Sequence, residues 1–131
     1  MVEPNRPIRI ALVADDDALI RRVMAITLES DGWTALEAAD GSATIEMLDT
    51  HEVDLCVMDR HMPGAPLESR LELIDRLRPQ AGIVVLSGDA DGPHPEGRVV
   101  YLAKPVDIQE LRDGVARAMD RAARGVGGET P

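Results

Sequence analysis

The chain has 131 residues, the size of one domain with a single core. Its formal net charge of −10 repels phosphate backbones, and its only aromatic residues, Trp33 and Tyr101, are too few to form a base-stacking surface. Composition therefore argues against direct nucleic-acid binding. The apolar run near the N-terminus is too short for a signal peptide and no segment approaches membrane-spanning length, so we expect a cytoplasmic protein without membrane contact.

Short apolar runs of strand length alternate along the chain with segments whose apolar residues recur at helical spacing. The expected strands occupy residues 8–14, 33–38, 53–59, 82–87 and 99–103. The expected helices occupy residues 17–29, 42–50, 67–77 and 108–119. The last helix opens with Asp107 and, three residues on, Glu110, which is a capping-box arrangement. The third strand is nearly all apolar and is predicted to be a fully buried central strand, and the last two are predicted to be buried as well.

This alternation implies parallel strands joined by right-handed crossovers, with helices on both faces. We predict an α/β fold: a doubly wound five-stranded parallel sheet over residues 8–123, with flexible termini at 1–7 and 124–131. One helix is missing from the pattern. Between the last two strands the stretch SGDADGPHPEG, residues 87–97, holds three glycines and two prolines. We therefore expect the fourth helix to be shortened or replaced by a loop.

Polar side chains gather at the carboxyl ends of the expected strands, where open parallel sheets bind their ligands. The first strand ends in three aspartates, residues 15–17; the third ends in Asp59 and the fourth in Ser87, and Lys104 follows the fifth. Clustered carboxylates are costly unless a cation relieves them, and Mg²⁺ prefers carboxylates, water and phosphate oxygens. These groups together suit a phosphoryl group: a cation would bind some of its oxygens, and the Ser87 hydroxyl and the Lys104 ammonium group would bind the others. One aspartate is then free to act as the nucleophile. Asp17 is also expected to cap the helix that follows it.

The segments LVADDD, DLCVMDRHMPG, VVLSG and YLAKP, in this order and with similar spacing, resemble the receiver domain of two-component response regulators. The resemblance extends from about Ile8 to Met119. It implies a flavodoxin-like (βα)5 fold and transfer of a phosphoryl group from a histidine kinase, or from a phosphotransfer protein, onto an aspartate. The reaction would use Mg²⁺ or Mn²⁺. Such a protein is a switch that catalyses only its own modification and is not otherwise an enzyme.

On this resemblance Asp59 is the phosphoacceptor. The metal ligands would be the carboxylates of Asp15, Asp16 and Asp59 together with the backbone carbonyl of His61. His61 and Asp89 also occupy positions that flank the path of the hydrolysing water, so we expect them to modulate the lifetime of the phosphoryl group.

The resemblance also assigns residues to the switch itself. Ser87 would be the switch hydroxyl and Lys104 the lysine that contacts the phosphoryl group. Tyr101 would be the aromatic residue whose rotamer follows activation. Pro105 matches a position where the family carries a cis peptide bond. A homodimer is compatible with the resemblance, and the downstream target is not indicated by it.

The sequence departs from the family pattern in two places. After MPG, the stretch APLESR precedes LELI, which gives a longer connection without the usual glycine. The interval from Ser87 to Lys104 is shorter than is typical, which removes length from the expected fourth helix. We therefore expect the phosphorylation chemistry to follow the family more closely than the partner-binding face does.

Two other functions remain open at this stage. A haloacid-dehalogenase-like phosphatase would use Asp15 as its nucleophile and Asp17 two residues on. The chain lacks the inserted flap expected after the first strand of such an enzyme. A receiver fold that serves as a binding module and is never phosphorylated is the second alternative.

Overall fold

The computed structural model describes residues 8–88 and 97–125. The strands are β1 (Ile10–Ala14), β2 (Thr34–Ala38), β3 (Leu55–Asp59), β4 (Gly82–Ser87) and β5 (Val99–Ala103). The helices are α1 (Ala18–Ser30), α2 (Gly41–Thr50), α3 (Leu67–Leu77) and α4 (Ile108–Arg124). Every element predicted from the sequence is therefore present, with its ends shifted by a few residues.

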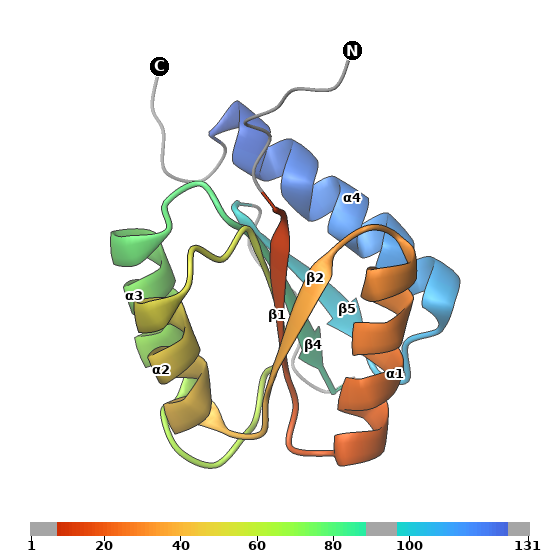
Figure 1. The fold of residues 1–131 in the computed structure, drawn as a ribbon, viewed down its shortest axis with the longest axis horizontal. Helices are drawn as coiled ribbons and strands as arrows, with labels where there is room; N and C mark the ends of the chain where they lie inside the picture. Colours follow the sequence, from red (N-terminus) through yellow and green to blue (C-terminus); the bar gives the residue numbers. More distant parts are fainter. Residues whose placement is uncertain (1–7, 89–96, 126–131) are drawn as a thin grey trace.

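The strands form one parallel sheet in the order β2-β1-β3-β4-β5. Helices α1 and α4 cover one face, and α2 and α3 cover the other (Figure 1). Each face carries its own aliphatic core, because the central strands are apolar on both sides. This arrangement confirms the predicted doubly wound α/β fold, and its strand order is that of flavodoxin-like sheets.

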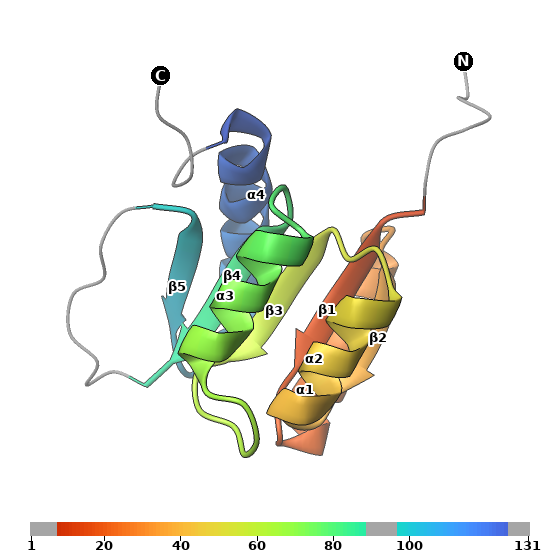
Figure 2. The ribbon, with the colours of Figure 1, turned by 90° about the vertical axis from the view of Figure 1, so that its left-hand side faces the viewer.

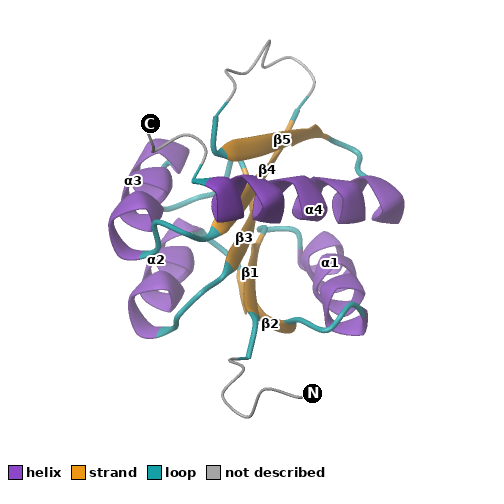
Figure 3. Cartoon of the chain, turned by 90° about the horizontal axis from the view of Figure 1, so that it is seen from above, coloured by secondary structure: helices purple, strands orange, loops and turns teal. Residues whose placement is uncertain are grey.

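The central and edge strands differ in burial. All residues of β3 and β4 are buried, as predicted. The prediction that β5 is also a buried strand was wrong. Only Val100 is buried in this strand, whereas Tyr101 and Leu102 are half-buried and Ala103 is exposed. Strand β5 lies at the edge of the sheet, so it has a neighbouring strand on one side only (Figure 3).

Aspartates begin three of the helices. The side chain of Asp17 accepts hydrogen bonds from the backbone of α1, as predicted, and Asp40 does the same for α2. Asp107 and Glu110 form the predicted capping box of α4, which Gly125 closes in a left-handed conformation. Helix α3 begins after Pro66 without a side-chain cap.

Four helices are present within residues 8–88 and 97–125. Strands β4 and β5 lie side by side (Figure 2), and the chain between them is described as far as Gly88 and again from Gly97. The prediction that a loop replaces the fourth helix falls on residues 89–96, which lie outside the described residues. None of the described helices has both the length and the hydropathy needed to cross a membrane.

Candidate functional site

Three carboxylates meet at the carboxyl-terminal edge of the sheet. Asp15 follows β1 and is fully buried, Asp59 ends β3 and is 6% exposed, and Asp16 is exposed. Each offers one oxygen, and these three oxygens lie within 4.8 Å of one another. The two buried carboxylates belong to adjacent strands, so the sheet itself holds them together. Such a cluster could hold a metal ion.

Lys104 supplies the positive charge of this edge. Its Nζ atom lies 3.2 Å from Asp59 Oδ2 and 3.9 Å from Asp15 Oδ2. The lysine directly follows β5, and its backbone N–H donates to the Ser87 carbonyl over 2.9 Å. The peptide bond between Lys104 and Pro105 is cis. The half-buried ammonium group therefore offsets part of the carboxylate charge while remaining in contact with solvent.

Asp15 is the most constrained acid of the cluster. Its Oδ1 atom accepts a hydrogen bond from the Asp17 backbone over 2.8 Å. Its Oδ2 atom is buried and accepts no hydrogen bond from any described residue. Burial raises the pKa of the Asp15 carboxyl above its ordinary value, and the nearby Asp59 charge adds to this effect. A buried carboxylate oxygen without a donor is a position where a cation fits.

The other predicted site residues lie at the same edge to different degrees. His61 donates its backbone N–H to Asp59 Oδ1 over 3.4 Å, and its side chain is exposed. Ser87 is buried at the end of β4, the strand next to β3. Tyr101 lies farther back, in the middle of β5, and packs against the core on the α2 and α3 face. Asp89 lies outside the described residues.

Two arginines that no sequence pattern indicated bind the backbone of the site aspartates. Arg21 in α1 donates to the Asp15 backbone carbonyl over 2.8 Å and pairs with Glu37 at 3.0 Å. Arg70 in α3 is fully buried and donates to the Asp59 backbone carbonyl over 3.0 Å. An arginine that binds main-chain carbonyls has no fixed spacing to its partners, so no sequence pattern indicates it.

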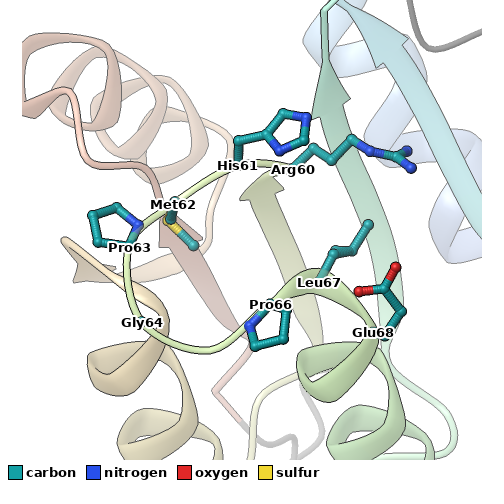
Figure 4. A pocket seen from close by; sticks show the side chains of 8 residues that line it. All are labelled: Arg60, His61, Met62, Pro63, Gly64, Pro66, Leu67 and Glu68. Carbon is teal, nitrogen blue, oxygen red and sulfur yellow. The ribbon is translucent and has the colours of Figure 1, made fainter.

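Two depressions border the site. One follows the loop between β3 and α3 and is lined by Arg60 and His61 where the loop begins and by Pro66 and Glu68 where it enters α3 (Figure 4). The other is an apolar groove of about 560 Å³ between α1 and the start of α4. Its lining comprises Leu19, Ile20, Val23, Met24, Thr27, Leu86, Lys104, Pro105, Val106, Asp107, Ile108 and Leu111. Lys104 thus belongs both to this groove and to the carboxylate cluster.

Comparison with known proteins agrees with this architecture. Residues 11–116 match the response regulator receiver domain family. PdtaR, a transcriptional regulatory protein of Mycobacterium tuberculosis, is 33% identical over 121 residues, which cover 86% of this chain and 58% of PdtaR. The CAI-1 autoinducer sensor kinase/phosphatase CqsS of Vibrio cholerae is 37% identical over 123 residues, covering 88% of this chain and 18% of CqsS. The chain thus spans only part of these relatives.

Among solved structures, the signal receiver domain of an HD domain-containing protein from Pseudomonas fluorescens is similar, with a TM-score of 0.77 and 26% identity. The alignment covers 90% of this chain and 99% of that one.

The chain belongs to the response regulator receiver domain family. A receiver domain is a signalling phosphoacceptor and not an enzyme with a separate substrate, and the acidic pocket of Asp15, Asp16 and Asp59 is consistent with a phosphorylatable aspartate.

Proposed function

We propose that this protein is a signalling switch in which Asp59 accepts a phosphoryl group from a phosphohistidine of a histidine kinase or a phosphotransfer protein. One observation carries the proposal: three carboxylate oxygens lie within 4.8 Å of one another, with Lys104 Nζ 3.2 Å from Asp59. Of the two buried carboxylates, Asp59 is the one that retains some exposure. Of these two it is therefore the acid that a donor in solution reaches, and it is also the one closer to Lys104.

In the proposed reaction an Asp59 carboxylate oxygen attacks phosphorus, and the bond from phosphorus to the donor imidazole nitrogen breaks. The imidazole keeps the electron pair of that bond, and an acyl phosphate forms on Asp59. Mg²⁺, held by Asp15, Asp16, Asp59 and the His61 carbonyl, would neutralise charge on the phosphoryl oxygens. The orphaned Oδ2 atom of Asp15 supports this ligand set.

The remaining site residues would contact the phosphoryl group on Asp59 or change conformation when it is present. Lys104 would bind a phosphoryl oxygen in a charge-assisted contact, and the Ser87 hydroxyl would bind another. Tyr101, which lies in β5 beside the strand that carries Ser87, would change its rotamer as the Ser87 contact forms. The exposed His61 imidazole would limit the access of water to the acyl phosphate, together with Asp89.

We further propose that the phosphodonor binds over the apolar groove between α1 and α4. The groove shares Lys104 with the carboxylate cluster, so a helix seated there would place its histidine beside Asp59. Leu19 is 73% exposed and Ile108 47% exposed along it, which is unusual for a face without a partner. Apolar side chains at helical spacing suit an amphipathic helix.

Labelling with a small phosphodonor tests the function. Incubation with acetyl phosphate and Mg²⁺, followed by mass spectrometry of the modified peptide, is expected to place the phosphoryl group on Asp59. Modification of Asp15 would support the phosphatase alternative. A protein that binds Mg²⁺ but is not modified by any donor would support the binding-module alternative.

A further inference from the structure

Arg70 is the largest fully buried side chain among the described residues. It lies at the end of the first turn of α3 and is the last residue of the stretch APLESR, in which the sequence departs from the family pattern. Burying a guanidinium ion is costly, and burial lowers its pKa from the ordinary value. No carboxylate of residues 8–88 and 97–125 forms a salt bridge with it. A buried charge kept at such a cost requires compensation from other groups.

The compensation comes from the backbone of the loop between β3 and α3. Arg70 Nη1 donates to the Asp59 carbonyl over 3.0 Å, and Nη2 donates to the Arg60 carbonyl over 2.8 Å. Nε donates to the Ala65 carbonyl over 3.1 Å. The rigid fork of one guanidinium thus ties the first residues of the loop to its last ones.

These bonds fix the peptide groups next to the phosphoacceptor. With the Asp59 and Arg60 carbonyls both held by Arg70, the peptide planes on either side of Arg60 have a set orientation. The following residue, His61, donates its N–H to Asp59 Oδ1 over 3.4 Å. Rotation of either held peptide would move the His61 carbonyl and break this contact.

A second anchor holds the outer side of the same loop. The Gly41 backbone at the start of α2 donates to the Pro63 carbonyl over 2.7 Å. A Cβ at Gly41 would lie 2.3 Å from the Ala65 nitrogen, so the loop and α2 are in direct contact there. The loop is therefore held on one side by Arg70 and on the other by α2, with its open face toward the depression in Figure 4.

We propose that Arg70 is a positioning residue for phosphoryl transfer. Its guanidinium sets the loop from Asp59 to Ala65 so that the Asp59 carboxylate and the His61 carbonyl face one divalent cation. The proposal rests on the proposed function of the site, because it assigns the His61 carbonyl to the metal. Arg70 itself touches neither the phosphoryl group nor the cation.

The test compares Arg70→Met with a matched variant near the amino-terminal ends of the strands, at the end of the sheet opposite to Asp59. Arg78, at the end of α3, donates only to main-chain carbonyls within the described residues, among them those of His51 and Leu48. Arg70 donates to three such carbonyls and, over 3.8 Å, to the Met58 sulfur. Arg78→Met therefore removes the same type of bond far from Asp59. Urea unfolding would measure stability, titration calorimetry the Mg²⁺ affinity, and acetyl phosphate labelling the reaction rate.

Both methionine variants are expected to lose stability. Only Arg70→Met is expected to weaken Mg²⁺ binding and to slow labelling, by roughly tenfold each, as is usual when a group that orients a metal ligand is removed. Arg70→Lys keeps the charge but not the fork, and we expect it to restore stability more fully than Mg²⁺ affinity. These measurements are made where the unfolding curves show each variant to be folded.

Parental Mg²⁺ affinity and labelling rate in folded Arg70→Met would overturn the proposal. If that variant does not fold, unchanged affinity in Arg70→Lys would overturn it in the same way. Equal losses in Arg70→Met and Arg78→Met would also overturn it, since the effect would then be one of stability alone. A parent that binds Mg²⁺ without being labelled would instead refute the proposed function, and the affinity comparison would still decide the role of Arg70.

Discussion

The two ends of the sheet use charge in opposite ways. At the amino-terminal ends of the strands, arginine side chains donate hydrogen bonds to backbone carbonyls, and Arg98 also forms an ion pair with Asp75. Arg98 donates to the Ala81 and Arg78 carbonyls, and Arg121 donates to those of Gly97 and Val99. At the carboxyl-terminal ends, three carboxylates lie together, two of them pair with Lys104, and a buried carboxylate oxygen accepts no hydrogen bond from any described residue.

The difference separates what stabilises the fold from what performs the chemistry. The amino-terminal end satisfies its polar groups, as a purely structural region does. The carboxyl-terminal end keeps like charges together at a cost in stability, which is typical of sites that bind a cation or a substrate. Substitutions at the amino-terminal end are therefore expected to change the free energy of unfolding, and substitutions at the carboxyl-terminal end to change metal binding and labelling.

The largest expected difference is between two Asp→Asn variants, one at each end of the sheet, and the quantity compared is the labelling of the protein. Asp59→Asn should abolish Mg²⁺-dependent labelling by acetyl phosphate, because an amide is not a nucleophile toward phosphorus at neutral pH. Asp54→Asn lies at the other end, where the Asp54 carboxylate accepts the Ile10 N–H over 2.9 Å. It should keep full labelling and cost about 1 kcal/mol of stability. An Asp59→Asn protein that is labelled like the parent would refute the assignment.

Lys104→Ala should remove the response to phosphorylation and change stability by only about 1 kcal/mol, because the lysine is 32% exposed and solvent screens its charge, although both carboxylates beside it are buried. Amide chemical shifts of Ser87 and Tyr101, recorded with and without beryllofluoride, would measure the response. Arg112→Ala, which removes an exposed pair with Asp31 on the surface, is the control and should respond as the parent does. Parental shift changes in Lys104→Ala would exclude the proposed role of this lysine.

At the amino-terminal end, Arg98→Met should lower the free energy of unfolding by about 2 kcal/mol, since two carbonyls lose their donor. Labelling of Asp59 should be unchanged. Trp33 is buried, so its fluorescence in urea reports unfolding directly. A large loss of labelling in a folded Arg98→Met protein would show that the two ends are coupled.

Much of this molecule could be predicted from its sequence. Apolar runs and helical spacing identified the elements because each central strand is covered on both faces. The grouping of Asp15, Asp16 and Asp59 could be predicted because the carboxyl ends of parallel strands meet at one edge of the sheet. Burial of β5 was predicted wrongly, since an apolar run does not tell an edge strand from a central one. Helix α1 shows the same limit: Leu19, Val23 and Ile26 fit the helical pattern but are exposed.

The positions of Arg21 and Arg70 could not be predicted for a different reason. Their partners are main-chain carbonyls brought close only by the tertiary fold, over separations of 6 and 11 residues. Side-chain spacing carries information about neighbours on one helix or strand, and neither contact is of that kind.

The smallest predicted effect concerns Asp15, and its sign is the most informative. Burial and the Asp59 charge raise the pKa of the Asp15 carboxyl above its ordinary value of 3.8, so the folded protein holds this proton more tightly than the unfolded chain does. Stability contributed by the protonated form is fully present below pH 3.8 and is lost as pH rises through the raised pKa. At neutral pH the ionised group therefore destabilises the protein when no metal is bound.

Asp15→Asn removes that charge and keeps an oxygen for the Asp17 N–H. Without Mg²⁺ at neutral pH, the variant should unfold at a temperature roughly 2–5 °C above the parent. The gain should shrink as the pH is lowered toward 3.8, where the parent carboxyl is protonated as well. Added Mg²⁺ should reverse the order, because it stabilises the parent by binding and the variant much less. A variant less stable than the parent at neutral pH without Mg²⁺ would mean that the Asp15 charge is already compensated in the free protein, and the site would then need no cation to be tolerated.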